Sequence, residues 1–426
     1  MAGRVIAAPR PGAIGCGTAH GVLRDDDVLE LLTEALAGWD LDGRRVACVV
    51  PDATRTAPMP FLHRAVSKLL EPRVGSLEWL IALGTHQPMR RDAIARHLGL
   101  DERDAAALAR VRNHEWREPD ALVEVGTISA QEVEEISGGL LAEAVPVRVN
   151  RRLLEHDVAI VVGPVFPHEV VGFSGGNKYF FPGLSGQELI DVSHWLGALH
   201  TSSAVIGTLG TTPIRRLIDR AAAFLPIGRR CVALVVRPSD ARLHGVYLGG
   251  CEDAWAAAAA LSSRVHVSRV EEPFDSVLAV APPMYADLWT AAKGVYKLEP
   301  VVADGGELVL HAPHVTSFST THGRAIAQVG YHCRDYFLAQ RDRFAGVPLG
   351  VLAHSTHVRG LGTYEDGVER CRISVTLATG IPREECERAG LGYADPAAID
   401  PTTWAGRGRS LVVEHAGEVL YRLATP

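Results

Sequence analysis

The chain has 426 residues, and its 43 Lys and Arg against 50 Asp and Glu give a net charge of -7. Hydrophobic residues make up 47% and charged residues 22%, which excludes a disordered chain, a collagen and a coiled coil. A mildly acidic chain without a long Lys/Arg run is a poor candidate for nucleic-acid or anionic-membrane binding. No apolar stretch approaches the ~20 residues that span a bilayer. We therefore expect neither nucleic acid nor a membrane among its partners.

The cysteines and the N-terminal residues indicate a cytoplasmic protein. The 7 cysteines are widely spread, and no two of them form a C-x-x-C pair, so a disulfide scaffold or a zinc ribbon is not expected. The first residues lack the apolar core of a signal peptide. We therefore expect reduced thiols and a cytoplasmic location.

Short apolar runs alternate with helical patterns along the chain. Residues 26–37 are amphipathic and predict a helix with Gly38 as its C-cap. Ser185 and Glu188 have the spacing of a capping box before a second helix. Buried strands are predicted at residues 45–50, 80–83, 158–162, 232–236 and 276–280. Because these runs are continuously apolar, the strands are expected to be covered on both faces, which is typical of an α/β fold with mainly parallel sheets.

Length and a polar stretch indicate two domains. At about 150 residues per domain, 426 residues correspond to two or three domains. A polar stretch at 268–273 precedes a new strand, and we place the boundary there, between residues 1–270 and 271–426. The tail after Gly406 could pack on either domain, and the sequence leaves this open.

Polar residues follow each of the first three predicted strands. Asp52, Thr54 and Arg55 follow the first, and 84–86 follow the second. The third runs into 166–168 and then into a Gly-rich segment. Ligands of open α/β sheets bind outside the carboxyl ends of the strands, so we expect these clusters to converge. Asp52 and Thr54 also suit the capping of a helix, whereas a guanidinium at Arg55 suits a carboxylate or phosphate.

His86 and His168 each follow a predicted strand. Taken alone, either histidine suits a structural or solvated position. Together, at the ends of neighbouring strands, they form a candidate acid/base pair. Two bases on opposite faces of one carbon are what an enzyme needs to invert a stereocentre.

The Gly-rich segment at 172–178 could bind a phosphate through its backbone amides. It is not a P-loop, because Lys178 is followed by Tyr179 and the glycine spacing differs. Lys178 itself suits a nucleophile, a phosphate ligand or a solvated surface residue. No dinucleotide-binding G-x-G-x-x-G is present.

The second half of the chain contains further candidate residues. Lys293 precedes Gly294 and suits a helix C-terminus. Six histidines lie at 311, 314, 322, 332, 354 and 357, but their spacings match no standard zinc pattern. A zinc hydrolase built on them remains an alternative. His194 and His200 are six residues apart, so they do not share a helix face as a metal pair would.

The ordered set of motifs resembles the lactate racemase family, whose members use a nickel-pincer nucleotide. The most specific match is the P-H-x-x-x-G-F-S-G-G-x-K stretch that ends at Lys178. The other matching pieces are 52–55, 84–86, 182–183, His194 and 293–294. The resemblance implies two α/β domains with the active site in the cleft between them.

The resemblance also implies a role for each residue. Lys178 would attach the cofactor covalently, and His194 would ligate nickel. His86 and His168 would be the catalytic acid/base pair. The nucleotide would be held by Asp52, Thr54, Ser174, Gly175, Gly176 and Trp289. The substrate carboxylate would be bound by Arg55 and Lys293.

The sequence departs from the family where the substrate is expected. Trp289 and Thr290 stand where the family has an aromatic residue and a glutamine, and 354–357 is His-Ser-Thr-His where we expect a tryptophan. This more polar lining, with Thr290 facing the substrate, favours a 2-hydroxy acid larger or more polar than lactate, such as a sugar acid or a hydroxy diacid.

The expected function is therefore inversion of the C2 stereocentre of a 2-hydroxy acid by hydride transfer to the nickel-pincer nucleotide. The alternatives are a lactate racemase proper and a non-catalytic nickel- or cofactor-binding protein. Proteins that synthesise the cofactor and insert nickel are the expected transient partners.

Overall fold

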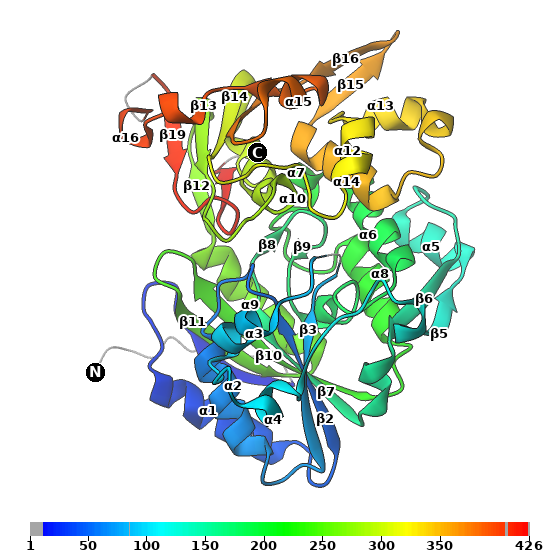
Figure 1. Cartoon of the computed structure of the whole chain (residues 1–426), viewed down its shortest axis with the longest axis vertical. Coiled ribbons are helices and arrows are strands. Elements are labelled where there is room, and N and C mark those ends of the chain that lie inside the picture. The colour runs from blue at the N-terminus through cyan, green and yellow to red at the C-terminus, as the bar shows by residue number, and fades with distance from the viewer. Residues whose placement is uncertain (1–11, 85, 405–407, 425–426) are drawn as a thin grey trace. The chain divides into compact units, whose positions relative to one another are not determined.

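The computed structural model of the chain describes residues 12–84, 86–404 and 408–424, and Figure 1 shows its helices and strands. The chain forms two compact units. Unit 1 comprises Met1–Phe166, Phe173–Ile190 and Leu209–Val265. Unit 2 comprises Pro167–Gly172, Asp191–Thr208 and His266–Pro426. The chain thus passes between the units more than once.

Unit 1 is built on a seven-stranded sheet. In chain order its strands are β1 (Ala13–Gly17), β2 (Arg45–Pro51), β3 (Ser76–Ala82), β4 (Val111–Asn113), β7 (Val158–Pro164), β10 (Gly228–Arg237) and β11 (Arg242–Gly249). Their order in the sheet is β1-β11-β10-β7-β2-β3-β4. Strands β10, β7, β2, β3 and β4 are parallel, and β11 is antiparallel to β1 and β10. The predicted α/β class with mainly parallel sheets is confirmed.

Helices cover both faces of this sheet. The helices wholly within unit 1 are α1 (Asp25–Gly38), α2 (Met59–Leu70), α3 (Arg91–Leu98), α4 (Ala105–Leu108), α5 (Ala130–Ser137), α8 (Pro213–Ala222) and α9 (Cys251–Val265). Along β10, Val232 and Leu234 belong to the core cluster that includes α1, α2 and α3. The intervening Cys231 and Ala233 point to the other face because side chains alternate along a strand, and they too are fully buried. Burial on both faces explains why the strands read as continuous apolar runs.

Helix α1 confirms the first predicted helix but ends differently. Its buried residues Val28, Leu32 and Leu36 recur every four positions, and three aspartates occupy its first turn, where negative charge is favourable. Gly38 was expected as the C-cap. Instead it is the last helical residue, and Trp39 leaves the helix in an extended conformation. The helix therefore ends without the left-handed residue that a glycine C-cap supplies.

The predicted capping box at Ser185 is also wrong. The hydroxyl of Ser185 donates to the carbonyls of Pro182 and Gly186. The carboxylate of Glu188 binds Arg148 at 2.8 Å. Helix α6 (Gln187–His200) begins two residues after Ser185. Ser185 thus bonds to carbonyls next to it in the chain and Glu188 to a distant arginine, so neither side chain caps the helix.

Unit 2 contains a five-stranded parallel sheet in the order β18-β17-β14-β13-β19. These strands are β13 (Phe274–Val280), β14 (Val302–Ala312), β17 (Ser374–Thr379), β18 (Gly392–Tyr393) and β19 (Ser410–Val413). Its helices of six or more residues are α12 (Gly323–Val329), α13 (Arg334–Ala339), α14 (Leu349–Arg359) and α15 (Arg383–Arg388). Shorter helices are α7 (Ser202–Val205), α10 (Leu288–Ala291), α11 (Lys293–Tyr296) and α16 (Pro401–Trp404).

Four small strand pairs complete the fold. They are β5 (Leu122–Ile128) with β6 (Val145–Asn150), β8 (Pro167–His168) with β9 (Gly172–Phe173), β12 (Val267–Val270) with β20 (Leu420–Leu423), and β15 (Gly362–Glu365) with β16 (Val368–Cys371). Through β20 and β19, the C-terminal tail pairs with strands of unit 2. Within the described residues, no helix has both the length and the apolarity needed to cross a membrane.

Candidate active site

Asp52 and His86 form a close pair in unit 1. Asp52 follows β2 and His86 follows β3, and these strands are parallel neighbours whose last residues, Pro51 and Ala82, are in register. The Nδ1 atom of His86 lies 2.6 Å from Oδ2 of Asp52. Since an ionised carboxylate can only accept, Nδ1 carries the proton. A neutral His86 therefore has a lone pair on Nε2, as a general base requires.

The Asp52 carboxylate is held ionised by its neighbours. Burial by itself would raise its pKa, but the charge and hydrogen bond of His86, the charge of Arg55 and the hydrogen bond of Thr54 hold the pKa of Asp52 well below its usual value. Its Oδ1 accepts from the Thr54 amide at 3.1 Å and from the Thr54 hydroxyl at 2.6 Å. Both oxygens of Asp52 are thus engaged within unit 1. This favours a positioning role towards His86, which the sequence did not indicate.

Arg55 adds a half-buried guanidinium beside this pair. Its Nη1 lies 3.3 Å from both the carbonyl and the hydroxyl of Thr54, and its guanidinium carbon is 5.4 Å from the centre of the Phe166 ring. The position suits the binding of a carboxylate. Thr85, the middle residue of the predicted second cluster, lies outside the described residues.

Two large side chains of unit 1 donate hydrogen bonds to the backbone carbonyls of the Gly-rich segment. The fully buried Arg215 donates to the carbonyls of Phe173 and Gly175, the latter at 3.1 Å. The indole Nε1 of Trp255 donates to the carbonyl of Ser174 at 2.9 Å. The guanidinium carbon of Arg215 in turn lies 4.2 Å from the centre of the Trp255 ring. Three successive carbonyls are therefore bound on the same side.

Because these carbonyls face Arg215 and Trp255, two backbone N–H groups of the segment point in the opposite direction. The amides of Gly175 and Gly176 share their peptide groups with the carbonyls of Ser174 and Gly175, so they point away from Arg215 and Trp255. Both glycines have positive φ, 87° and 59°. A Cβ on Gly175 would lie 2.5 Å from the Val165 side chain, so a larger residue does not fit. Successive amides in such a turn form an anion site, as the sequence predicts for a phosphate.

The side chain of Asn177, the residue before Lys178, is bound by three other side chains. The Asn177 amide nitrogen donates to Asp219 at 2.9 Å and to Glu252 at 2.7 Å, and its oxygen accepts from Arg229 at 2.7 Å. Lys178 lies beside it in the 3₁₀ turn η3 (Gly176–Tyr179) and is half-buried. The sequence gave no sign of this network, because its members come from four separate segments of the chain.

His168 lies in unit 2 with a different set of partners. It belongs to strand β8 and is 4% exposed. Its Nδ1 accepts a hydrogen bond from the Val170 amide at 3.1 Å and lies 3.4 Å from Oε2 of Glu169. His86 and His168, predicted as one acid/base pair, are thus held differently at Nδ1.

Lys293 and Thr290 lie on the short helices α11 and α10 of unit 2. Lys293 is 6% exposed, and its Nζ is 4.9 Å from the centre of the Tyr285 ring. The Thr290 hydroxyl donates to the Asp287 carboxylate at 2.9 Å, and the Thr290 amide donates to the same carboxylate, so Asp287 is the N-cap of helix α10. A role in binding the substrate remains a prediction for both residues.

Trp289 is sandwiched between two histidines. Its ring centre is 4.3 Å from that of His354 and 4.7 Å from that of His322. His354 is buried in α14, and within the described residues its Nε2 has no hydrogen-bond partner. Burial is the largest cause that holds the pKa of His354 well below its usual value. A neutral imidazole with a free ring nitrogen suits the binding of a hydroxyl group.

His194 is a half-buried residue on helix α6, and its Nδ1 lies 3.4 Å from the Ser193 hydroxyl. The structure shows no cluster of three or more His, Cys, Asp or Glu side chains able to hold a metal ion in the described ranges. A metal at His194 would therefore take its other ligands from a bound cofactor. The amides of Gly175 and Gly176 suit a phosphate, and an imidazole such as that of His194 suits nickel.

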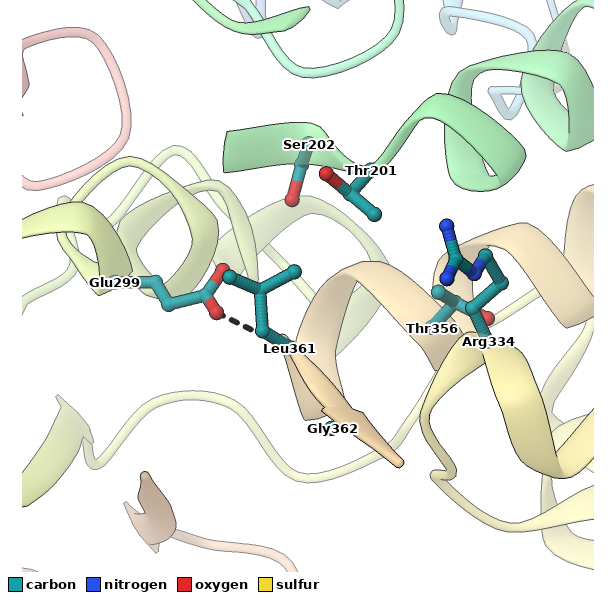
Figure 2. Close-up of a pocket in the computed structure, with 8 residues that line it drawn as sticks. Thr201, Ser202, Glu299, Arg334, Thr356, Leu361 and Gly362 are labelled. Atoms are coloured by element: carbon teal, nitrogen blue, oxygen red, sulfur yellow. Dashed lines mark hydrogen bonds between the residues drawn. The ribbon is translucent and has the colours of Figure 1, made fainter. Parts of the chain in front are cut away.

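A small cavity in unit 2 lies near the end of α14 and is shown in Figure 2. It has a volume of about 20 Å³, enough for a water molecule or two. The buried Glu299 carboxylate lines it and accepts from the Leu361 amide at 2.8 Å. This cavity is too small for an organic acid, so it is not the substrate site.

Comparisons with known proteins agree with the motifs. Residues 31–207 match the lactate racemase N-terminal domain. A lactate racemase of Thermoanaerobacterium thermosaccharolyticum is 24% identical over 63% of this chain, and one of Lactiplantibacillus plantarum is 22% identical over 69%. The first match spans 60% of the relative's own length, which is less than two thirds, and the second spans 68%.

Two solved structures resemble the whole chain. A protein of Thermotoga maritima is 31% identical, with a TM-score of 0.87 over 95% of this chain and 100% of its own. The lactate racemase apoprotein of Thermoanaerobacterium thermosaccharolyticum shares the fold, with a TM-score of 0.71, 18% identity and 95% of each chain covered. The resemblance to the lactate racemase family is thus confirmed: residues 31–207 match its N-terminal domain, two lactate racemases are relatives, and the chain shares the fold of a lactate racemase apoprotein.

Proposed function

We propose that this protein is an isomerase that inverts the C2 stereocentre of a 2-hydroxy acid larger or more polar than lactate. The two relatives named lactate racemase support an isomerase of the racemase type. The observation that supports the chemistry best is the Asp52–His86 pair, with 2.6 Å between carboxylate and imidazole. A buried carboxylate that fixes the tautomer of a histidine is the arrangement of a general base.

The cofactor we propose is the nickel-pincer nucleotide. Lys178 would hold it covalently, the amides of Gly175 and Gly176 would bind its phosphate, and His194 would ligate its nickel. When bound, the group supplies a hydride acceptor that returns the hydride to either face of C2. Cofactor-synthesis and nickel-insertion proteins would then be transient partners of this chain.

The protein's own residues orient the substrate and move its hydroxyl proton. Arg55 and Lys293 bind the C1 carboxylate by charge-assisted hydrogen bonds. For one enantiomer, Nε2 of His86 accepts the hydroxyl proton as C2 is oxidised. For the inverted product, protonated His168 donates a proton to the oxygen as C2 is reduced. The opposite direction exchanges these two roles.

The proposed preference for a polar substrate is supported by unit 2. His354 and His357 are buried polar residues on α14, and in the described part of the chain both ring nitrogens of His357 lack a hydrogen-bond partner. Burial lowers the pKa of His357 to about 4, so its ring is neutral at pH 7. Neutral imidazoles would hydrogen-bond hydroxyl groups beyond C2, which lactate does not have.

The test is to incubate protein co-expressed with the cofactor-synthesis proteins with single enantiomers of 2-hydroxy acids in deuterated buffer. We expect inversion of a sugar acid or hydroxy diacid, faster than that of lactate, without deuterium at C2. Deuterium at C2 would show proton abstraction and refute hydride transfer. Faster turnover of lactate than of every polar analogue would refute the substrate proposal and leave a lactate racemase.

The roles of the two histidines can be tested in the half-reaction. His86→Ala is expected to slow hydride removal from one enantiomer more than from the other, and His168→Ala is expected to show the opposite bias. Net inversion should fall on the order of 10²–10⁴-fold in either variant. Inversion at the wild-type rate in both variants would show that these histidines have no catalytic role. Wild-type protein that binds the cofactor but inverts no 2-hydroxy acid would leave a non-catalytic cofactor-binding protein.

A further inference from the structure

The Nδ1 atom of His168 faces both a hydrogen-bond donor and a hydrogen-bond acceptor. The Val170 amide donates to it at 3.1 Å, which requires a lone pair on Nδ1. Oε2 of Glu169 lies 3.4 Å away, and an ionised carboxylate requires a proton on Nδ1. The first contact stabilises the neutral ring with its proton on Nε2. The second stabilises the ring with its proton on Nδ1, whether neutral or doubly protonated.

Glu169 remains ionised although its side chain is buried. Burial by itself would raise its pKa, but the positive charges of Lys297 and Lys293, together with a hydrogen bond from the backbone, outweigh this and hold the pKa of Glu169 below its usual value. Lys297 is 1% exposed and donates to the carbonyl of Gly417, so its charge has a fixed position. The carboxylate beside His168 is therefore a permanent and well-placed acceptor.

At His86, by contrast, the position of the ring proton is fixed. Its Nδ1 faces the Asp52 carboxylate at 2.6 Å, which holds the proton on Nδ1 in every protonation state. His168 differs because its carboxylate is more distant and competes with an amide at a shorter distance. The neutral form that the structure favours at His168 has its proton on Nε2, and this form cannot accept a proton there.

We propose that Glu169 is a positioning residue that lets His168 change between its two tautomers. As a base, His168 needs its proton on Nδ1, facing Glu169, and a lone pair on Nε2 that accepts the substrate proton. The resulting imidazolium is paired with the same carboxylate. As an acid, the imidazolium releases the Nε2 proton and returns to the Nδ1–H form. The Val170 amide stabilises the resting Nε2–H form between turnovers. The catalytic consequence depends on the proposed function, whereas the tautomer equilibrium does not.

The experiment uses the full chain without cofactor, with its histidines labelled with ¹⁵N. The ring nitrogen shifts of His168 give the ratio of neutral tautomers, and His168→Gln assigns the signals by their loss. A hydrogen bond to a charged group exceeds one to a neutral group by about 1.4 kcal/mol, which is a factor of ten. Glu169→Gln is therefore expected to lower the ratio of Nδ1–H to Nε2–H about tenfold.

Two further variants make the result specific. Glu169→Asp keeps the charge and should retain a ratio between those of wild type and Glu169→Gln. Glu299→Gln is the matched control, because Glu299 is also a buried glutamate of unit 2 but accepts from the Leu361 amide instead. It should leave the His168 ratio unchanged. An unchanged ratio in Glu169→Gln, or the same change in Glu169→Asp as in Glu169→Gln, would overturn the proposal.

Kinetic measurements on protein that carries the bound cofactor distinguish a failure of this proposal from a failure of the proposed function. Glu169→Gln should slow oxidation of the enantiomer whose proton His168 accepts about tenfold more than oxidation of the other. Equal slowing of both enantiomers would overturn the proposed role. A tautomer shift in a protein that inverts no 2-hydroxy acid would refute the proposed function but support the assignment of Glu169.

Discussion

Replacing Asp52 by asparagine should remove the general base without removing the histidine. In the native protein, Oδ1 of Asp52 accepts two hydrogen bonds from Thr54, and Oδ2 faces Nδ1 of His86. An asparagine would keep its oxygen towards Thr54, because the Thr54 amide can only donate. Its NH₂ group would then face His86. The neutral ring would move its proton to Nε2 and lose the lone pair that accepts the substrate proton.

The expected loss follows from this tautomer change. General acid-base catalysis contributes roughly 10²–10⁴-fold, and the same substitution in an Asp–His pair of hydrolases lowers kcat by about 10⁴. We therefore expect kcat for the direction in which His86 is the base to fall on the order of 10²–10⁴-fold. Loss of a hydrogen bond to a charged group should also cost about 1.5–3 kcal/mol of unfolding free energy.

The assay is single-turnover reduction of the bound cofactor by each pure enantiomer, followed by absorbance, together with urea unfolding. The matched control is Asp240→Asn, because Asp240 also faces a histidine in unit 1, with 3.3 Å to Nε2 of His244. This control should retain the wild-type rate. An Asp52→Asn protein that is folded, loaded and within threefold of the wild-type rate for both enantiomers would refute the assignment of His86 as a base held by Asp52.

Three further predictions concern the cofactor and the fold. Intact-mass spectrometry of protein co-expressed with the cofactor-synthesis proteins should show an adduct that Lys178→Ala abolishes; an adduct that survives would exclude this attachment. His194→Ala should lose nickel, measured by elemental analysis, while its circular dichroism stays unchanged; retained nickel would exclude His194 as the ligand. His114 is fully buried between Asn150 and the Ser185 carbonyl, and burial lowers its pKa from 6.5 to about 4. The unfolded state therefore binds the proton first, so its contribution to stability, about 3 kcal/mol, should be lost as pH falls from about 6.5 to about 4. Urea unfolding of His114→Gln should show a shallower pH dependence over this window; an equally steep one would contradict the assignment.

The sequence by itself determined the α/β class and the main strands. Runs such as 158–162 are apolar at every position, and that pattern requires cover on both faces, which the parallel sheets provide. It also indicated that residues after neighbouring strands would meet. Asp52 and His86 do so within unit 1, because β2 and β3 are parallel and in register at their carboxyl ends.

Only the tertiary structure decided which partners these residues have. Asp52 suits a helix cap, and its pairing with His86 requires a contact across 34 positions. Arg215 and Trp255 reach the Gly-rich segment from 40 and 81 residues away, and no local pattern marks them. The same applies to Glu169, whose ionisation depends on two lysines brought close by folding. Local periodicity reports which face of an element is buried, whereas the charge state and tautomer of a side chain depend on the groups that surround it in space.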